Sequence, residues 1–268
     1  MAAPQNLFEI NVDAEKLPKI KREQLHSLVA KVLFASKRAR PDTDLAISYL
    51  MTRSQSPDVD DWKKLAHMMR YLRGTKDLPL TLGASEKRVL HWMIDASHAV
   101  HPKMRGHTGG GLTLGRGFPI SHSGKQKLNT RSSTETELVG VDDMMPDVLW
   151  SGLFLEEQGF HVNKNVVHQD NQAAILLEKN GKLSSGKRTK HINTRYFFVT
   201  DRIAKGDISV SWCPTEDMTG DFWTKPLQGA LFQRFRDLIM GVVPHPKPRG
   251  LKPQSMKNKL SSTKHQKN

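Results

Sequence analysis

Two aspartates stand at the ends of predicted strands, and two further acids stand in predicted helices. Asp95 closes the apolar run Val89–Ile94, and Asp170 closes a second, shorter run. If these strands are parallel neighbours, both carboxylates emerge at the same edge of a sheet, about 4.8 Å apart. Glu137 lies in the first turns of a long helix, and Asp221 opens a helix near the end of the chain. The sequence therefore favours one pocket that collects four carboxylates.

Four carboxylates in one pocket repel each other strongly unless a divalent cation neutralises them. A ligand set made of carboxylates alone favours Mg²⁺ or Mn²⁺ over Zn²⁺. Two such ions about 4 Å apart would activate water and stabilise the leaving oxygen of a phosphodiester. The spacing leaves an alternative open, because any α/β domain carries aspartates at strand ends without binding a metal.

The composition points to a polyanionic partner, with nucleic acid first. Lys and Arg number 41 against 27 Asp and Glu, a formal net charge of +14, although half of this surplus lies in residues 241–268. The single cysteine, Cys213, excludes a disulfide scaffold and a multi-cysteine zinc site. It also favours a reducing, intracellular compartment, cytoplasmic or nuclear. Neither a membrane span nor a secretory signal is expected, because no sufficiently long apolar run occurs.

The chain divides into four segments that must position these acids. Residues 1–19 form an N-terminal extension, and residues 20–87 form a small helical segment with apolar stripes at i, i+3 and i+4. Residues 88–240 alternate predicted strands and helices in the order βββ-α-β-α-β-α, which predicts an α/β fold with a mixed sheet. Residues 241–268, rich in Lys, Ser and Pro, form a basic tail that is expected to be disordered.

The predicted helix that carries Glu137 has its own start and break signals. Ser132 offers a hydroxyl cap at its start, and Pro146 is expected to bend or split it. Asp142–Asp143 resembles the double-aspartate signature of polymerases, which needs a hairpin between two apolar strands. Because this pair lies inside a helical stripe, no polymerase active site is expected in the chain.

Six sequence blocks occur in an order that resembles one known family. The blocks are Met93–Ser97, Ser132–Leu138, Gln169–Ile175, Thr189–Phe197, Cys213–Asp217 and Thr224–Leu227. Together they resemble the ribonuclease H region of copia-type LTR retrotransposon Pol polyproteins. Residues 20–82 resemble the connection segment at the end of the reverse transcriptase in those polyproteins. The likeness covers roughly residues 20 to 240.

The resemblance implies a ribonuclease H-like fold, a five-stranded mixed sheet with flanking helices, preceded by the helical connection segment. It implies endonucleolytic hydrolysis of the RNA strand of RNA–DNA hybrids with two Mg²⁺ or Mn²⁺ ions. Carried over block by block, it places the catalytic, metal-binding acids on Asp95, Glu137, Asp170 and Asp221. Glu135 competes with Glu137, because residues two positions apart point about 200° away from each other on a helix.

Binding of the hybrid would need cationic side chains near these acids. The best internal basic cluster consists of Lys187, Arg188, Lys190 and His191. Two interpretations stay open: a solvated loop, or phosphate contacts that position the duplex without reading its sequence. An upstream reverse transcriptase segment is a further expected partner.

Two other features carry weaker expectations. His98, His101 and His107 lack further ligands at suitable spacing, which favours a surface cluster over a metal site. The glycines Gly109–Gly111 allow a close backbone approach, either at a tight strand bend or against the backbone of a bound hybrid.

Two other functions stay open beside the nuclease. A truncated or co-opted element could keep the fold and bind nucleic acid without turnover. An integrase or transposase shares the fold but joins DNA strands; the single cysteine and the ending Thr224–Leu227 argue against it. The sequence does not fix an oligomeric state.

Overall fold

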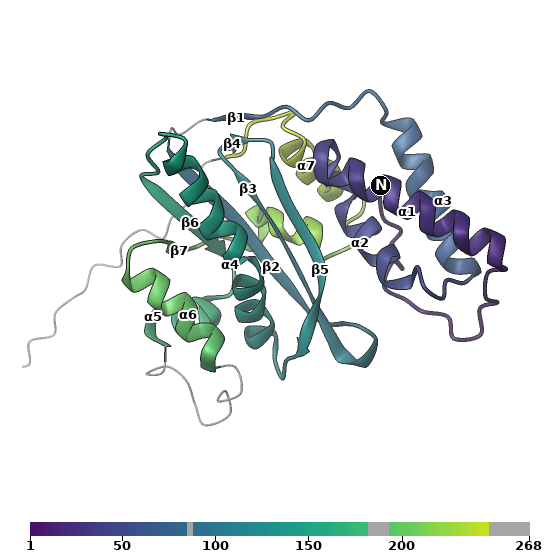
Figure 1. Cartoon of the computed structure of the whole chain (residues 1–268), viewed down its shortest axis with the longest axis horizontal. Helices are drawn as coiled ribbons and strands as arrows, with labels where there is room; N and C mark the ends of the chain where they lie inside the picture. The colour runs from purple at the N-terminus through teal and green to yellow at the C-terminus, as the bar shows by residue number, and fades with distance from the viewer. Residues whose placement is uncertain (85–87, 182–192, 247–268) are drawn as a thin grey trace, which may run out of the picture.

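A computed structural model describes residues 1–84, 88–181 and 193–246 of the 268-residue chain. A twisted sheet with helices on both faces forms the centre of the molecule, and a helical N-terminal segment lies beside it (Figure 1). The predicted basic tail and the basic cluster Lys187, Arg188, Lys190 and His191 lie largely or wholly outside the described residues. Within the described ranges, none of the helices combines the length and apolarity that a bilayer crossing needs.

The main sheet has five strands: β2 (Val89–His101), β3 (Arg105–Thr113), β5 (Ile120–Asn129), β6 (Lys164–Gln169) and β7 (Ser209–Trp212). Their spatial order is β5-β3-β2-β6-β7. The β5, β3 and β2 strands form an antiparallel meander, and β6 and β7 continue from β2 in parallel. This mixed order confirms the predicted ribonuclease H-like fold. A separate two-stranded sheet pairs β1 (Gly83–Ala84) with β4 (Gly115–Arg116).

One difference concerns the length of β2. The sequence predicts that this strand ends at Asp95, but it continues to His101. The extension pairs with β3, where Ser97 lies opposite His107. Cross-strand hydrogen bonds therefore sustain a stretch that lacks the apolar pattern of a strand, and Asp95 lies within the strand and not at its end.

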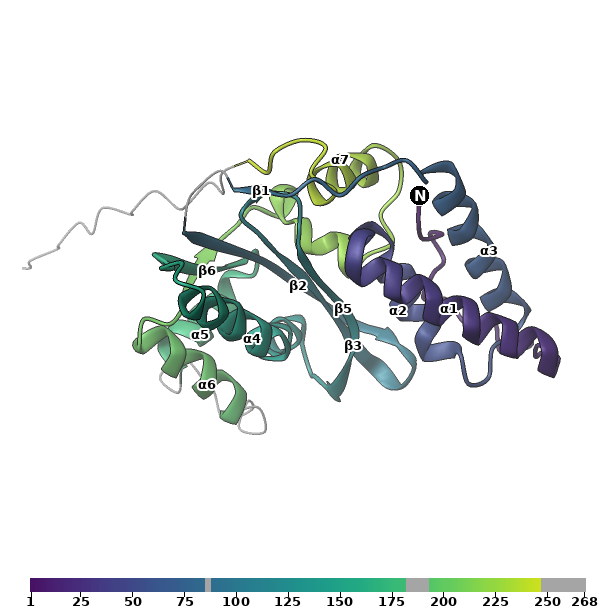
Figure 2. The ribbon, with the colours of Figure 1, turned by 45° about the horizontal axis from the view of Figure 1, so that its top comes forward.

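Helix α4 (Ser133–Glu157) covers one face of the sheet, with α5 (Gln172–Asn180) and α6 (Asn193–Ala204) beside it (Figures 1 and 2). The Ser132 side chain accepts a hydrogen bond from the backbone N–H of Glu135, 3.2 Å away, which confirms the predicted cap. The helix stays one element through Pro146, so of the two expected effects of this proline, a bend or a split, the split does not occur. Its apolar face packs on β2 in a core that includes Trp92, Ile94, Val141 and Met144.

The opposite face of the sheet is covered by the short 3-10 helix η6 (Thr219–Trp223) and by α7 (Gly229–Ile239). A Cβ atom at Gly109 would lie 2.7 Å from the backbone carbonyl carbon of Trp223, and one at Gly110 would lie 2.6 Å from the Met93 carbonyl oxygen. The three glycines 109–111 are buried. The structure therefore supports close packing of η6 and α4 on β3 as the reason for glycine at these positions.

The N-terminal segment contains the three predicted helices α1 (Lys19–Ala39), α2 (Asp44–Arg53) and α3 (Val59–Gly74), with a 3-10 turn at Pro41–Thr43. Asp58 caps α3 in a reciprocal capping box. These helices enclose a core of their own. Helix α2 packs against β5 (Figures 1 and 2).

The N-terminal segment also shares polar and apolar contacts with the η6 face of the sheet. Tyr71 belongs to the same buried cluster as Trp223. The Trp223 indole N–H donates to the carbonyl oxygen of Pro41 at 3.0 Å. Within the N-terminal segment, the Tyr71 hydroxyl donates to Asp42 at 2.6 Å. The buried carboxylate of Asp44 accepts from the Ser121 hydroxyl on β5. Helical segment and sheet are thus packed together without an intervening solvent layer.

Candidate active site

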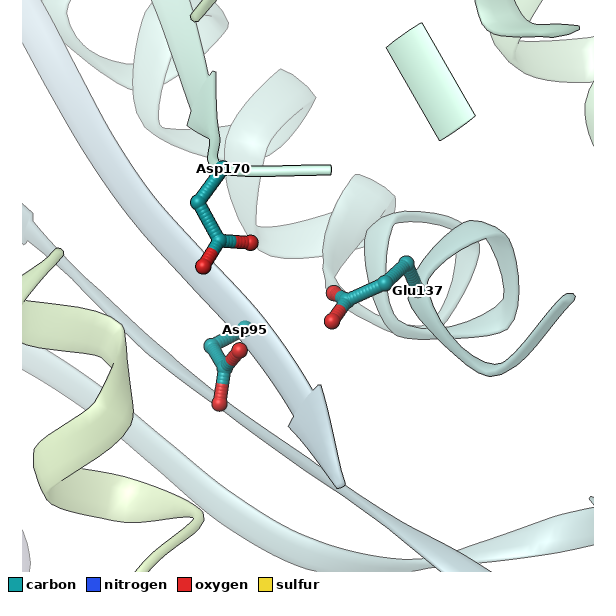
Figure 3. Close-up of side chains that lie close together, drawn as sticks. All are labelled: Asp95, Glu137 and Asp170. Atoms are coloured by element: carbon teal, nitrogen blue, oxygen red, sulfur yellow. The ribbon is translucent and has the colours of Figure 1, made fainter. Parts of the chain in front are cut away.

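Parallel pairing of β2 with β6 brings two of the predicted acids together. Met93 lies opposite His168 in this pair, and side chains two positions apart in a strand point to the same face. Asp95 comes two positions after Met93, and Asp170 comes two positions after His168, so both aspartates point to the same face. Figure 3 shows their carboxylates side by side. The prediction that the strands are parallel neighbours is confirmed.

Helix α4 supplies the third acid. Asp95, Glu137 and Asp170 each offer a carboxylate oxygen, and these oxygens lie within 4.8 Å of one another. Figure 3 shows the three side chains pointing into a common space from β2, α4 and the end of β6. The competing Glu135 accepts instead from the backbone N–H of Arg131 at 2.7 Å, as part of the helix N-terminus. As expected, only one of the two glutamates faces the other acids.

Burial makes this group of carboxylates electrostatically strained. Asp95 is 2% exposed and Glu137 is 6% exposed, and the buried Oε2 atom of Glu137 has no hydrogen-bond partner among the described residues. Burial, together with the charges of Asp95 and Asp170, raises the pKa of Glu137 well above its usual value. Burial and the charge of Asp95 also raise the pKa of Asp170, against the effect of the Thr215 hydroxyl, which donates to it at 3.0 Å.

The fourth predicted acid, Asp221, lies next to this group but is engaged elsewhere. It is located on η6, a 3-10 helix, and not at the start of an α-helix as predicted. Its Oδ1 atom accepts from the Lys225 ammonium at 2.7 Å. Burial and the charge of Asp95 raise the pKa of Asp221 to about 7, although Lys225 opposes the shift.

Two neighbouring residues complete the site, and sequence reasoning assigned no chemistry to them. The Thr224 hydroxyl donates a hydrogen bond to Oδ2 of Asp95, and the Lys225 ammonium lies 3.7 Å from the same oxygen. Gly220 allows this approach, because a Cβ atom there would lie 2.9 Å from the Asp95 nitrogen. In the sequence, the block Thr224–Leu227 supports the family likeness and argues against an integrase, but it carries no sign of a contact with Asp95.

Asp95, Glu137 and Asp170 line an open cleft together with Ser97, His98 and Lys225. Of the three histidines predicted to form a surface cluster, His98 is the one that reaches this cleft. His101 and His107 are 4% and 0% exposed, so the expectation of a surface cluster is wrong for them. Nε2 of His101 lies 2.7 Å from Nδ1 of His107, at hydrogen-bond distance. Nε2 of His107 lies 2.7 Å from the Ser123 hydroxyl oxygen.

The donor set fits a hard divalent cation. Its members are oxygen ligands only, which Mg²⁺ and Mn²⁺ prefer. A buried carboxylate oxygen without a partner is costly, and a cation among Asp95, Glu137 and Asp170 would satisfy it. The arrangement can therefore hold a divalent ion at the floor of the cleft.

Comparisons with known proteins find Pol polyproteins of transposons that are similar to the chain, and no family model matches it. The chain is 30% identical over 214 residues to the Retrovirus-related Pol polyprotein from transposon TNT 1-94 of Nicotiana tabacum, covering 80% of this chain and 16% of that protein. It is 34% identical over 209 residues to the corresponding polyprotein from transposon RE2 of Arabidopsis thaliana, covering 77% of this chain and 14% of that protein. The chain thus spans about a sixth of the length of these relatives.

Among solved structures, two ribonucleases H1 align with about half of the chain. One, isolated from compost, has 10% identity and a TM-score of 0.38, and covers 50% of this chain and 91% of its own. The other, from the archaeon Halobacterium salinarum, has 12% identity and a TM-score of 0.31, and covers 49% of this chain and 90% of its own. The fold assignment rests on the strand order and register and not on these alignments.

Proposed function

We propose that this homologue of copia-type Pol polyproteins is a metal-dependent ribonuclease H that cleaves the RNA strand of RNA–DNA hybrids endonucleolytically. The observation that carries the proposal is the meeting of Asp95, Glu137 and Asp170, which are far apart in the sequence, within 4.8 Å in one cleft. The homology to Pol polyproteins supports the same conclusion. We assign these three acids as catalytic metal ligands and Asp221 as the fourth.

The residues of the chain have separate tasks in this proposal. Asp95, Glu137 and Asp170 would hold Mg²⁺ or Mn²⁺, and a pair of such ions supplies activation of water and stabilisation of the leaving oxygen. Thr224 fixes one oxygen of Asp95 through its hydrogen bond. Because the pKa of Glu137 is raised, this side chain retains its proton over a wider pH range and must release it for cation binding.

Binding of the substrate is the second part of the proposal. We assign phosphate contacts to Lys187, Arg188, Lys190 and His191, which would make affinity fall as salt concentration rises. A net charge of +14 favours such a polyanionic partner. An upstream reverse transcriptase segment is a proposed protein partner, and an intracellular location, cytoplasmic or nuclear, is proposed with it.

Cleavage of a labelled RNA–DNA hybrid by the purified chain tests the function. In Mg²⁺ or Mn²⁺ we expect the wild-type chain to cleave the RNA strand, and the Asp170→Asn variant to lose more than about 100-fold of this activity, since loss of an outer-shell contact alone costs 10–100-fold. A matched control is Asp77→Asn, which changes an exposed aspartate of the N-terminal segment. It should cleave like the wild-type chain.

Two outcomes would contradict the proposal. Equal metal-dependent cleavage by Asp170→Asn would remove the site assignment. Tight hybrid binding by the wild-type chain with no turnover in either metal would instead favour a binding module with the same fold.

A further inference from the structure

The cationic side chain at the site, Lys225, occupies a specific position between two of the acids. Its ammonium lies 2.7 Å from Oδ1 of Asp221 and 3.7 Å from Oδ2 of Asp95. It does not bridge the other acids in this way: the three oxygens that converge belong to Asp95, Glu137 and Asp170. The Lys225 ammonium is thus shared between Asp221 and Asp95. Among the described residues, Glu137 and Asp170 have no cation within ion-pair distance.

The local backbone holds the lysine in this position. The Lys225 N–H donates to the carbonyl oxygen of Asp221 at 2.9 Å, and a spacing of four residues brings the two side chains over each other. The backbone thereby places the Lys225 ammonium in ion-pair distance of both carboxylates.

An ammonium and a divalent cation compete for the same oxygens. If a second ion is to use Asp221 together with Asp95, as the four-acid assignment requires, it must replace the Lys225 ammonium on Asp221, because like charges on a shared oxygen repel each other. The Lys225 side chain is 42% exposed, so it can leave this position for solvent or for a phosphate in the cleft.

We propose that the Lys225 ammonium occupies the second cation position of the site, so that the free protein binds one divalent ion and admits the second only when the lysine is displaced. The inference rests on the proposed function, because it assumes that the three-carboxylate group binds a metal. A substrate phosphate in the cleft would pair with the lysine and free Asp221. Loading of the second ion would then depend on substrate.

Counting bound Mn²⁺ on the full chain tests this inference without measuring activity. Isothermal titration calorimetry, with free Mn²⁺ measured by electron paramagnetic resonance, gives the number of ions per chain. We expect one ion for the wild-type chain and two for Lys225→Met, which removes the charge but keeps the length of the side chain. Lys225→Arg, which keeps the charge, should bind one. Circular dichroism and thermal melting confirm that each variant is folded.

Each result has a distinct meaning. Two ions on the wild-type chain, or one ion on a folded Lys225→Met variant, would overturn the role of the lysine and leave the nuclease proposal in place. No Mn²⁺ on any variant would overturn the metal site itself, and with it both proposals.

Discussion

Neutralising Glu137 should stabilise the metal-free protein, although it destroys the site. Glu137→Gln keeps the shape of a side chain that is 6% exposed, and it removes one of three carboxylates lying within 4.8 Å of one another. At this separation and an effective dielectric constant near 20, two unit charges repel by about 3 kcal/mol. Because the raised pKa of Glu137 lets a proton relieve part of this repulsion, we expect a gain of about 2 kcal/mol at pH 8.

The stability gained by Glu137→Gln should increase as the pH rises. The pKa of Glu137 is higher in the folded protein than its ordinary value of 4.5, so above pH 4.5 the folded state binds more protons than the unfolded state. The free energy of unfolding of the wild-type chain therefore falls relative to the variant as the pH rises above 4.5. The two proteins should be equally stable well below that pH.

Urea denaturation and thermal melting at several pH values, in EDTA and in Mg²⁺, measure both effects. In EDTA at pH 8 the variant should melt roughly 4–8 °C above the wild-type chain, from about 2–4 °C per kcal/mol for a chain of this size. In Mg²⁺ the stability difference between the variant and the wild-type chain should become smaller or change sign, because only the wild-type chain is stabilised by binding the ion. Glu135→Gln is the matched control. Its amide oxygen can still accept from the Arg131 N–H, but the variant loses a negative charge that favours the helix N-terminus, so it should be less stable than the wild-type chain. A variant no more stable than the wild-type chain at pH 8 in EDTA would refute the electrostatic account.

Two further substitutions, with one control substitution, test the packing that holds the site. Gly110→Ala should destabilise by several kcal/mol, since its Cβ atom would lie 2.6 Å from a carbonyl oxygen, whereas Gly74→Ala, with nothing within 4 Å, should be neutral or stabilising in thermal melting. Trp223→Phe should cost about 1 kcal/mol in denaturant unfolding, because it removes the hydrogen bond to Pro41; a variant as stable as the wild-type chain would show that this contact contributes nothing.

Local signals in the sequence were sufficient for most elements of the fold. The hydroxyl of Ser132 marks the start of α4, and the apolar stripe of the N-terminal helices predicts all three of them. The extension of β2 beyond Asp95 could not be predicted, because it depends on pairing with β3 and not on its own residues. The continuity of α4 through Pro146 likewise depends on packing against the sheet, which stabilises a helix that the local sequence would interrupt.

The acids were predictable to different degrees. The proximity of Asp95 and Asp170 follows from the parallel pairing of β2 with β6, and the apolar run before each aspartate is the sequence signal that predicts it. The choice of Glu137 over Glu135 does not, because both lie in the first turns of one helix and the capping contact to Arg131 decides between them. The role of Lys225 could not be predicted from the sequence, because a lysine four residues after an aspartate is typical of a solvent-exposed helix surface. Only the tertiary structure places Lys225 in the cleft.

The position of Asp95 is coupled to the N-terminal segment through the short helix η6. Pro41 accepts the indole N–H of Trp223, and the Trp223 carbonyl oxygen accepts the Ser123 hydroxyl on β5 at 2.8 Å. The next residue, Thr224, donates to Asp95. A hydrogen bond from Thr224 can hold one carboxylate oxygen only if Thr224 is itself fixed, and both the helical segment and β5 fix it. We therefore propose that the described residues of the helical segment and of the sheet fold as one unit. Removing the helical segment would leave every acid of the site in the chain but would make the position of the Asp95 carboxylate less fixed.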